Sequence, residues 1–159
     1  YMYNVPGRTG VNILPATVAR LANECPNIVG YKAASGNLAQ LKELIALKPP
    51  HFDVFSGDDA LTVDIMEAGG VGVISVFGNA YPKEMIALVR AMQEGRVSDA
   101  RNRHDRLNEL FQLIFVDGNP SGIKALLNIH GKLENVLRLP LVPACDDTYS
   151  DLQQAITLL

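Results

Sequence analysis

Short apolar runs alternate with helix-like segments along the first part of the chain. The runs are 1–5, 28–32, 53–56 and 72–76, and each is followed by a turn and a segment of helical periodicity. The runs are continuously apolar, which is typical of parallel strands that are covered on both faces. Alternation of strand and helix predicts βαβ units and a right-handed parallel sheet.

Helix-start signals follow each run. Proline at a first helical position predicts helices that begin at Pro15 and Pro82, and Asn37 is a candidate cap for the helix between them. The paired carboxylates of Asp58 and Asp59 favour a further helix start, where the helix dipole stabilises negative charge. The apolar residues expected to face the sheet from these helices are Val18, Leu21, Ala22, Leu38, Leu41, Leu44, Ile45, Leu61, Ile65, Met66, Met85, Ile86 and Val89.

The later part of the chain has no strand pattern. Its periodicity predicts helices at 98–115, 120–130 and 146–158. We therefore expect 1–95 to be the last four βα units of a barrel and 96–159 to be a C-terminal helical extension. The predicted fold class is α/β, as the second half of a (β/α)8 TIM barrel, because a full barrel needs ~250 residues. A doubly wound sheet is the alternative, but the chain lacks a complete dinucleotide fingerprint.

Composition limits the partners. The 159 residues are 48% hydrophobic, which predicts a substantial core, and the net charge is −3 without a basic block. Nucleic acid and anionic membranes are therefore excluded as expected partners. Cys25 and Cys145 lie far apart, without metal-type spacing, which favours reduced thiols in a cytoplasmic protein. No apolar stretch reaches the length that a membrane-spanning helix needs.

Three polar side chains are expected at the carboxyl ends of the first two strands, where barrel active sites lie. Lys32 ends an apolar run, and desolvation there disfavours its ammonium form, so its amine can form a Schiff base with a carbonyl. Tyr3 can move a proton, and Arg8 can hold a carboxylate. The alternatives are structural: Lys32 only closes a strand, Tyr3 is an aromatic at the core edge, and Arg8 caps a loop.

Five segments resemble one known family. They are Tyr-Asn-Val-Pro-Gly-Arg-Thr-Gly at 3–10, Gly-Tyr-Lys-Ala-Ala-Ser-Gly at 30–36, Ser-Gly-Asp-Asp-Ala at 56–60, Gly-Val-Ile-Ser-Val at 72–76, and Asn119-Pro120 followed by Lys124. In order and spacing they are similar to the second half of the dihydrodipicolinate synthase (4-hydroxy-tetrahydrodipicolinate synthase) family. The expected partner is accordingly the N-terminal half of the barrel, which carries the family's proton-relay threonine, and we expect 1–159 alone to be inactive.

The resemblance implies a lyase that condenses pyruvate with L-aspartate 4-semialdehyde in lysine and diaminopimelate biosynthesis. By position, Lys32 matches the lysine that forms the imine, Tyr3 the proton-relay tyrosine, and Arg8 the arginine that binds the semialdehyde carboxylate. Gly57 and Ile74 match residues around bound pyruvate, Ile74 through its backbone. The resemblance implies a cytoplasmic homo-oligomer, a dimer or tetramer, and no metal or other cofactor.

Two departures from the family pattern leave the substrate open. Ala33 stands where the family often has glutamate, and Phe77 and Gly78 replace Thr-Ala after the fourth strand. The alternatives are a related class I pyruvate aldolase, acting on N-acetylneuraminate or a 2-keto-3-deoxy sugar acid, or a catalytically incomplete fragment. The arginine within the 3–10 segment favours the synthase.

Overall fold

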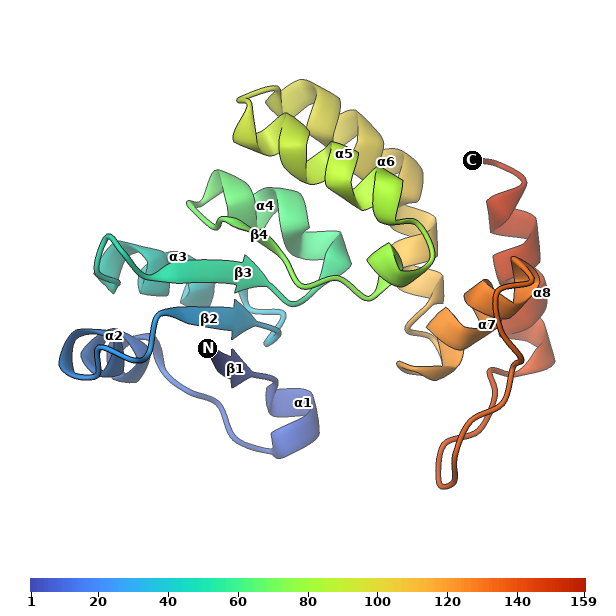
Figure 1. The fold of residues 1–159 in the computed structure, drawn as a ribbon, viewed down its shortest axis with the longest axis horizontal. Coiled ribbons are helices and arrows are strands. Elements are labelled where there is room, and N and C mark those ends of the chain that lie inside the picture. The colour runs from blue at the N-terminus through green and yellow to red at the C-terminus, as the bar shows by residue number, and fades with distance from the viewer. The chain divides into compact units, whose positions relative to one another are not determined.

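Four parallel strands, neighbours in chain order, form the sheet of the first part of the molecule (Figure 1). The computed structural model describes residues 1–159, which divide into two compact units, Tyr1–Ser75 and Val76–Leu159. The strands all lie in the first unit and are β1 (Met2–Asn4), β2 (Gly30–Ala33), β3 (Asp53–Ser56) and β4 (Gly72–Val73). The four predicted apolar runs are thus confirmed as strands, although the fourth ends three residues before the predicted limit.

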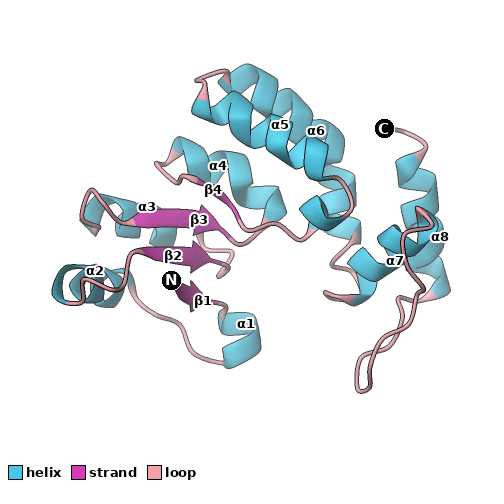
Figure 2. Ribbon diagram, viewed as in Figure 1, coloured by secondary structure: helices cyan, strands magenta, loops and turns pink.

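Helices of the first unit follow the strands as predicted (Figure 2). Asn37 caps its helix, and its side chain accepts a hydrogen bond from the Gln40 backbone N–H at 3.0 Å. A short helix after β1 was not expected from the sequence. The helical elements are α1 (Pro6–Thr9), α2 (Pro15–Glu24), α3 (Leu38–Leu47), the 3-10 turn η1 (Asp59–Leu61) and α4 (Thr62–Glu67).

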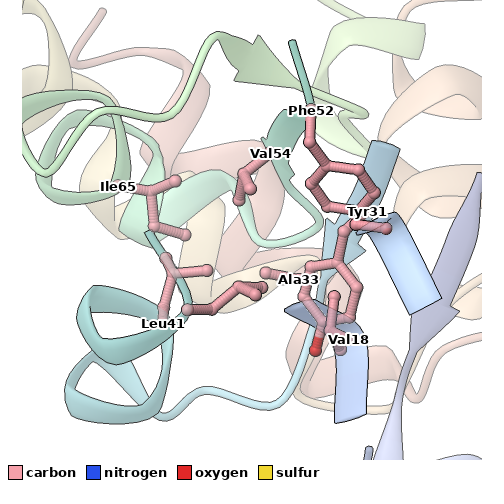
Figure 3. Close-up of a cluster of buried hydrophobic side chains, with 9 residues drawn as sticks. Val18, Tyr31, Ala33, Leu41, Phe52, Val54 and Ile65 are labelled. Atoms are coloured by element: carbon pink, nitrogen blue, oxygen red, sulfur yellow. The ribbon is translucent and has the colours of Figure 1, made fainter. Parts of the chain in front are cut away.

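The core of the first unit lies between one face of the sheet and its helices. Figure 3 shows Val18 of α2, Leu41 of α3 and Ile65 of α4 around strand residues such as Tyr31 and Val54. All five side chains are buried. Burial of this kind contributes about 1.5–3 kcal/mol for each large aliphatic side chain, so this face holds the helices on the sheet.

The other face of the sheet is not covered within this unit. Tyr1 and Tyr3 of the β1 region are 68% and 48% exposed, and Ile74 is 43% exposed. In residues 1–159 helices thus cover one face of the strands, and coverage of the second face stays a prediction. Side chains of a strand alternate between the two faces of a sheet. This alternation places Tyr3, Lys32 and Phe55 on the uncovered face.

The second unit is helical. It contains the 3-10 turn η2 (Phe77–Asn79), α5 (Pro82–Gln93), α6 (Val97–Leu113), α7 (Ser121–Ile129) and α8 (Asp146–Ile156). These elements confirm the helices predicted after residue 97 to within three residues at each end. Inside the unit, the Phe77 ring stacks on Tyr81 at 4.9 Å and meets Phe111 edge-on at 5.0 Å. No helix in the structure has the length and apolarity to cross a membrane.

One predicted core residue of α5 is wrong. Ile86 is 49% exposed, whereas Leu88 is fully buried beside Met85. An α-helix has 3.6 residues per turn, so residues three apart lie on the same face. The buried stripe of α5 therefore runs through Met85, Leu88 and Ala91, and Ile86 lies on the opposite side. The division of the chain at residue 95 stays a prediction, since the compact units meet at Ser75 and Val76.

We expect Leu88→Ala to lower the free energy of unfolding by about 2–5 kcal/mol, because the substitution leaves a cavity in a packed core. Ile86→Ala removes a solvent-exposed side chain from the same helix and is the matched control, with a loss below about 0.5 kcal/mol. Urea denaturation of the protein expressed from its natural gene measures both. If both variants lose the same free energy of unfolding, Ile86 is buried in the core after all.

Candidate active site

Tyr3 and Lys32 are neighbours at the carboxyl end of the sheet. The register of β1 and β2 places these two residues side by side. The Lys32 Nζ lies 4.1 Å from the centre of the Tyr3 ring, within the distance of a cation–π contact. Both side chains lie on the uncovered face, and the Lys32 amine lies over the Tyr3 ring.

Gly57 makes room for the Lys32 side chain. This glycine directly follows β3, and its backbone N–H donates to the Ala33 carbonyl at 2.7 Å. A Cβ at this position would lie 3.0 Å from Lys32 Cε and 2.9 Å from both the Ala33 carbonyl oxygen and the Ala34 Cβ. Any larger side chain would therefore displace the lysine stem or the backbone that carries it.

Ile74 follows β4, and hydrogen bonds at Ile74 and at the next residue hold this strand end. Its N–H donates to the Ser56 carbonyl at 2.8 Å. The hydroxyl of the next residue, Ser75, donates a short hydrogen bond to the carboxylate of Asp59, which is 1% exposed. The backbone at Ile74 is thus fixed at the strand end, while its side chain stays partly exposed.

The two aspartates after β3 have different partners. Asp58 caps η1, as predicted, and accepts from the Ala60 N–H at 3.0 Å. Burial raises the pKa of the Asp58 carboxyl, an effect that the hydrogen bond from Ala60 opposes. Asp59 lies in the first turn of η1 and accepts a hydrogen bond from the Ser75 hydroxyl.

Arg8 lies on α1, the exposed helix that directly follows β1. The structure thus brings Tyr3, Lys32 and Gly57 into direct proximity. It places Arg8 and Ile74 on the segments just beyond β1 and β4, at the same end of the parallel strands. None of the predicted site residues falls outside the unit that contains the sheet.

An aromatic pair near Lys32 was missed by sequence reasoning. The Tyr1 and Phe55 rings meet edge-on at 5.8 Å, and Phe55 is the register neighbour of Lys32 on β3. Gly30 permits this packing, since a Cβ there would lie 2.2 Å from Tyr1 Cε1. The sequence offered one signal for this pair: residues two apart on a strand lie on the same face, which puts Tyr1 beside Tyr3 and Gly30 beside Lys32.

The opposite face of the same strands carries a second polar feature. Tyr31 is buried, and burial raises the pKa of its phenol, whereas a hydrogen bond with the Asn4 side chain acts in the other direction. Asn4 is itself 1% exposed. Sequence reasoning did not single out either residue, because a buried amide in an apolar run has no local signature.

The fold is an α/β sheet of parallel strands with its polar groups at the carboxyl ends, as in about half of a (β/α)8 barrel. The profile of the Dihydrodipicolinate synthetase family matches residues 1–159. The chain belongs to this family, which confirms the resemblance found in the sequence.

Named relatives and solved structures agree. The 4-hydroxy-tetrahydrodipicolinate synthase of Phocaeicola vulgatus is 48% identical over 158 residues, which are 99% of this chain and 53% of that protein. A dihydrodipicolinate synthase crystal structure from Thermotoga maritima superposes with a TM-score of 0.96 at 43% identity, covering 99% of this chain and 55% of that one. The Acinetobacter baumannii enzyme complexed with pyruvate gives a TM-score of 0.93 at 35% identity, covering 98% and 53%. The chain spans about half the length of the curated relatives it matches.

We expect Gly57→Ala to lower the free energy of unfolding by about 1–3 kcal/mol, the range for overpacking a fitted site. Two of the three atoms around the added Cβ belong to the Ala33 and Ala34 main chain or Cβ, which cannot swing aside. Gly7→Ala is the matched control, since a Cβ there meets nothing within 4 Å. If both variants unfold at the same denaturant concentration, the close approach of Lys32 to Gly57 is wrong.

Proposed function

We propose that these residues carry the pyruvate-binding side of a 4-hydroxy-tetrahydrodipicolinate synthase. This lyase condenses pyruvate with L-aspartate 4-semialdehyde to give 4-hydroxy-tetrahydrodipicolinate and water. The observation that carries the proposal is the Lys32 amine, 4.1 Å from the Tyr3 ring at the strand ends. Membership of the family and the relatives of that name support it.

Lys32 is the proposed nucleophile. Its neutral amine attacks the C2 carbonyl carbon of pyruvate, and the resulting carbinolamine loses water to leave an imine. The adjacent Tyr3 phenol donates the proton that allows the hydroxyl to depart as water. Loss of a proton from C3 then gives an enamine, whose C3 attacks the aldehyde carbon of the second substrate. The amino group of that substrate finally attacks C2, closes the ring and releases the Lys32 amine.

The surrounding residues fit the two substrates. Gly57 lies against the Lys32 stem, where any larger side chain would displace it, and Ile74 follows the neighbouring strand at the same end of the sheet, so we propose that both residues line the pyruvate site. The Arg8 guanidinium, on the exposed α1, is the proposed partner for the semialdehyde carboxylate, because arginine binds carboxylates through two parallel hydrogen bonds.

The proposal extends to the whole protein. We propose a cytoplasmic homo-oligomer in which 1–95 supply four βα units of the barrel and 96–159 a helical extension. Because the chain spans about half of its curated relatives, we propose that turnover also needs strands corresponding to the rest of those relatives. Such strands would cover the face that carries Tyr3 and Lys32 and would keep water from the imine.

Pyruvate with borohydride is expected to leave a permanent adduct on Lys32, because borohydride reduces the imine to a stable amine. The experiment uses the protein expressed from its natural gene, with peptide mass spectrometry to locate the adduct. Lys32→Ala should abolish labelling, and so should Lys32→Arg, since a guanidinium stays protonated and forms no imine. Labelling of Lys83 or Lys124 in place of Lys32 would overturn the assignment.

Arg8→Ala should raise KM for the semialdehyde about ten- to a hundredfold and leave KM for pyruvate almost unchanged. A hydrogen bond to a charged group is worth roughly 1.5–3 kcal/mol, which corresponds to this range. Steady-state kinetics with each substrate varied in turn makes the measurement. Equal changes in both KM values would mean that Arg8 only shapes its loop.

A further inference from the structure

Asn4 links the strand end to the segment that carries Arg8. Its side chain is buried, on the face of β1 opposite to Tyr3. The Asn4 Nδ2 donates to Asn12 Oδ1 at 2.8 Å, and the Asn4 Oδ1 accepts from the Ile13 backbone N–H at 3.1 Å. One buried amide thus holds two successive residues at the far end of that segment.

Gln40 completes the same hydrogen-bond network from α3. The Gln40 Nε2 donates to Asn12 Oδ1 at 3.1 Å and to the Ile13 carbonyl at 3.1 Å. In return, the Asn12 Nδ2 donates to Gln40 Oε1 at 2.9 Å. Gln40 is 28 residues beyond Asn12 and belongs to the helix that follows the strand of Lys32. The network of Asn4, Asn12 and Gln40, here called the amide network, therefore joins two successive βα units.

The segment that the amide network closes is anchored at its two ends, by β1 at one end and at the other by the network together with Ile13, which packs against the core. Residues 5–13 leave the sheet after β1 and include α1, which contributes no buried residue. Within the segment, Thr9 supplies a local bond from its hydroxyl to the Val11 carbonyl at 3.0 Å. Because α1 contributes no buried residue, the contacts at the two ends of the segment contribute to where α1 and Arg8 lie.

The residue types fit a positioning role. Burying an amide costs free energy unless its donor and acceptor are both hydrogen-bonded. Asn4 therefore contributes through its hydrogen bonds and not through apolar packing. Hydrogen bonds are directional, and the paired amides of Asn12 and Gln40 fix distance and orientation together. Ile13 also packs against the core, but an apolar contact of this kind holds the loop without fixing its angle.

We propose that the amide network positions Arg8 and thereby sets the affinity of the site for the carboxylate of the second substrate. The inference rests on the proposed function of Arg8. Gln40 is a positioning residue that acts from α3 and touches neither substrate. Its loss should loosen the 5–13 segment while leaving Tyr3, Lys32 and the imine chemistry intact.

Gln40→Ala is the test variant, because the side chain lies partly at the surface and its removal leaves Asn4 bonded to Asn12 and Ile13. Glu43→Ala, an exposed position on the same helix, is the matched control. In the protein expressed from its natural gene, Gln40→Ala should raise KM for the semialdehyde about three- to tenfold, the range for losing one or two neutral hydrogen bonds. The kcat and the KM for pyruvate should change by less than about twofold, and Glu43→Ala should change nothing.

A second measurement is independent of activity. Trypsin cleaves after Arg8 when the segment opens, so Gln40→Ala should be cut there about three- to tenfold faster than the parent protein, by the same hydrogen-bond range. Cleavage at the parent rate would overturn the proposal. So would an unchanged KM for the semialdehyde in Gln40→Ala if Arg8→Ala raises it.

The failure of the proposed function is distinguishable from the failure of the amide network. If Arg8→Ala leaves KM for the semialdehyde unchanged, the carboxylate-binding role of Arg8 is wrong, and with it the affinity part of this inference, whatever trypsin shows. If Arg8→Ala raises that KM, the double variant Arg8→Ala/Gln40→Ala should show no further rise. A further rise in the double variant would mean that Gln40 acts on the substrate by another route.

Discussion

The register between β1 and β2 is the constraint on which the site depends. Parallel backbone hydrogen bonds set Tyr3 beside Lys32, and Phe55 beside Lys32 on the next strand. A slip of one residue would turn the amine toward the helices, into a core that contains Tyr31 and Val54. Burial of Tyr31 on that side therefore opposes any slip, because the apolar core and the reactive face belong to the same strands.

Because side chains alternate along each strand, one face of the sheet carries the proposed site and the other packs against the helices. Tyr3 and Lys32 face the side where chemistry is proposed, whereas Asn4, Tyr31 and Ala33 face the helices. A residue next to a proposed site residue in the sequence is therefore part of the scaffold. Substitution at Asn4 is expected to act through the loop it holds, and substitution at Tyr3 on the proton transfer proposed for it.

Local signals in the sequence predicted much of this arrangement, as the helix start at Pro15 and the cap at Asn37 show. Lys32 was a candidate because it ends an apolar run, and Gly57 because the segment around it resembles the family; both are local properties of the chain. Ile86 was misplaced since two of its neighbours on α5 are also apolar, and only packing decides which of them is buried. The contact between Asn12 and Gln40 could not be predicted, because the choice of partner across 28 residues follows from tertiary structure.

The energetic balance of the two faces explains why the polar network lies where it does. Large aliphatic side chains such as Val18 and Leu41 supply non-directional stabilisation, which tolerates small shifts of a helix against the sheet. A loop with the carboxylate-binding role proposed for Arg8 would tolerate less, because bidentate recognition depends on angle as well as distance. Directional amide bonds at Asn4 and Gln40 meet that demand at the edge of the core. The apolar face holds the strands and helices together, and the amide hydrogen bonds tie the segment that carries Arg8 to this core.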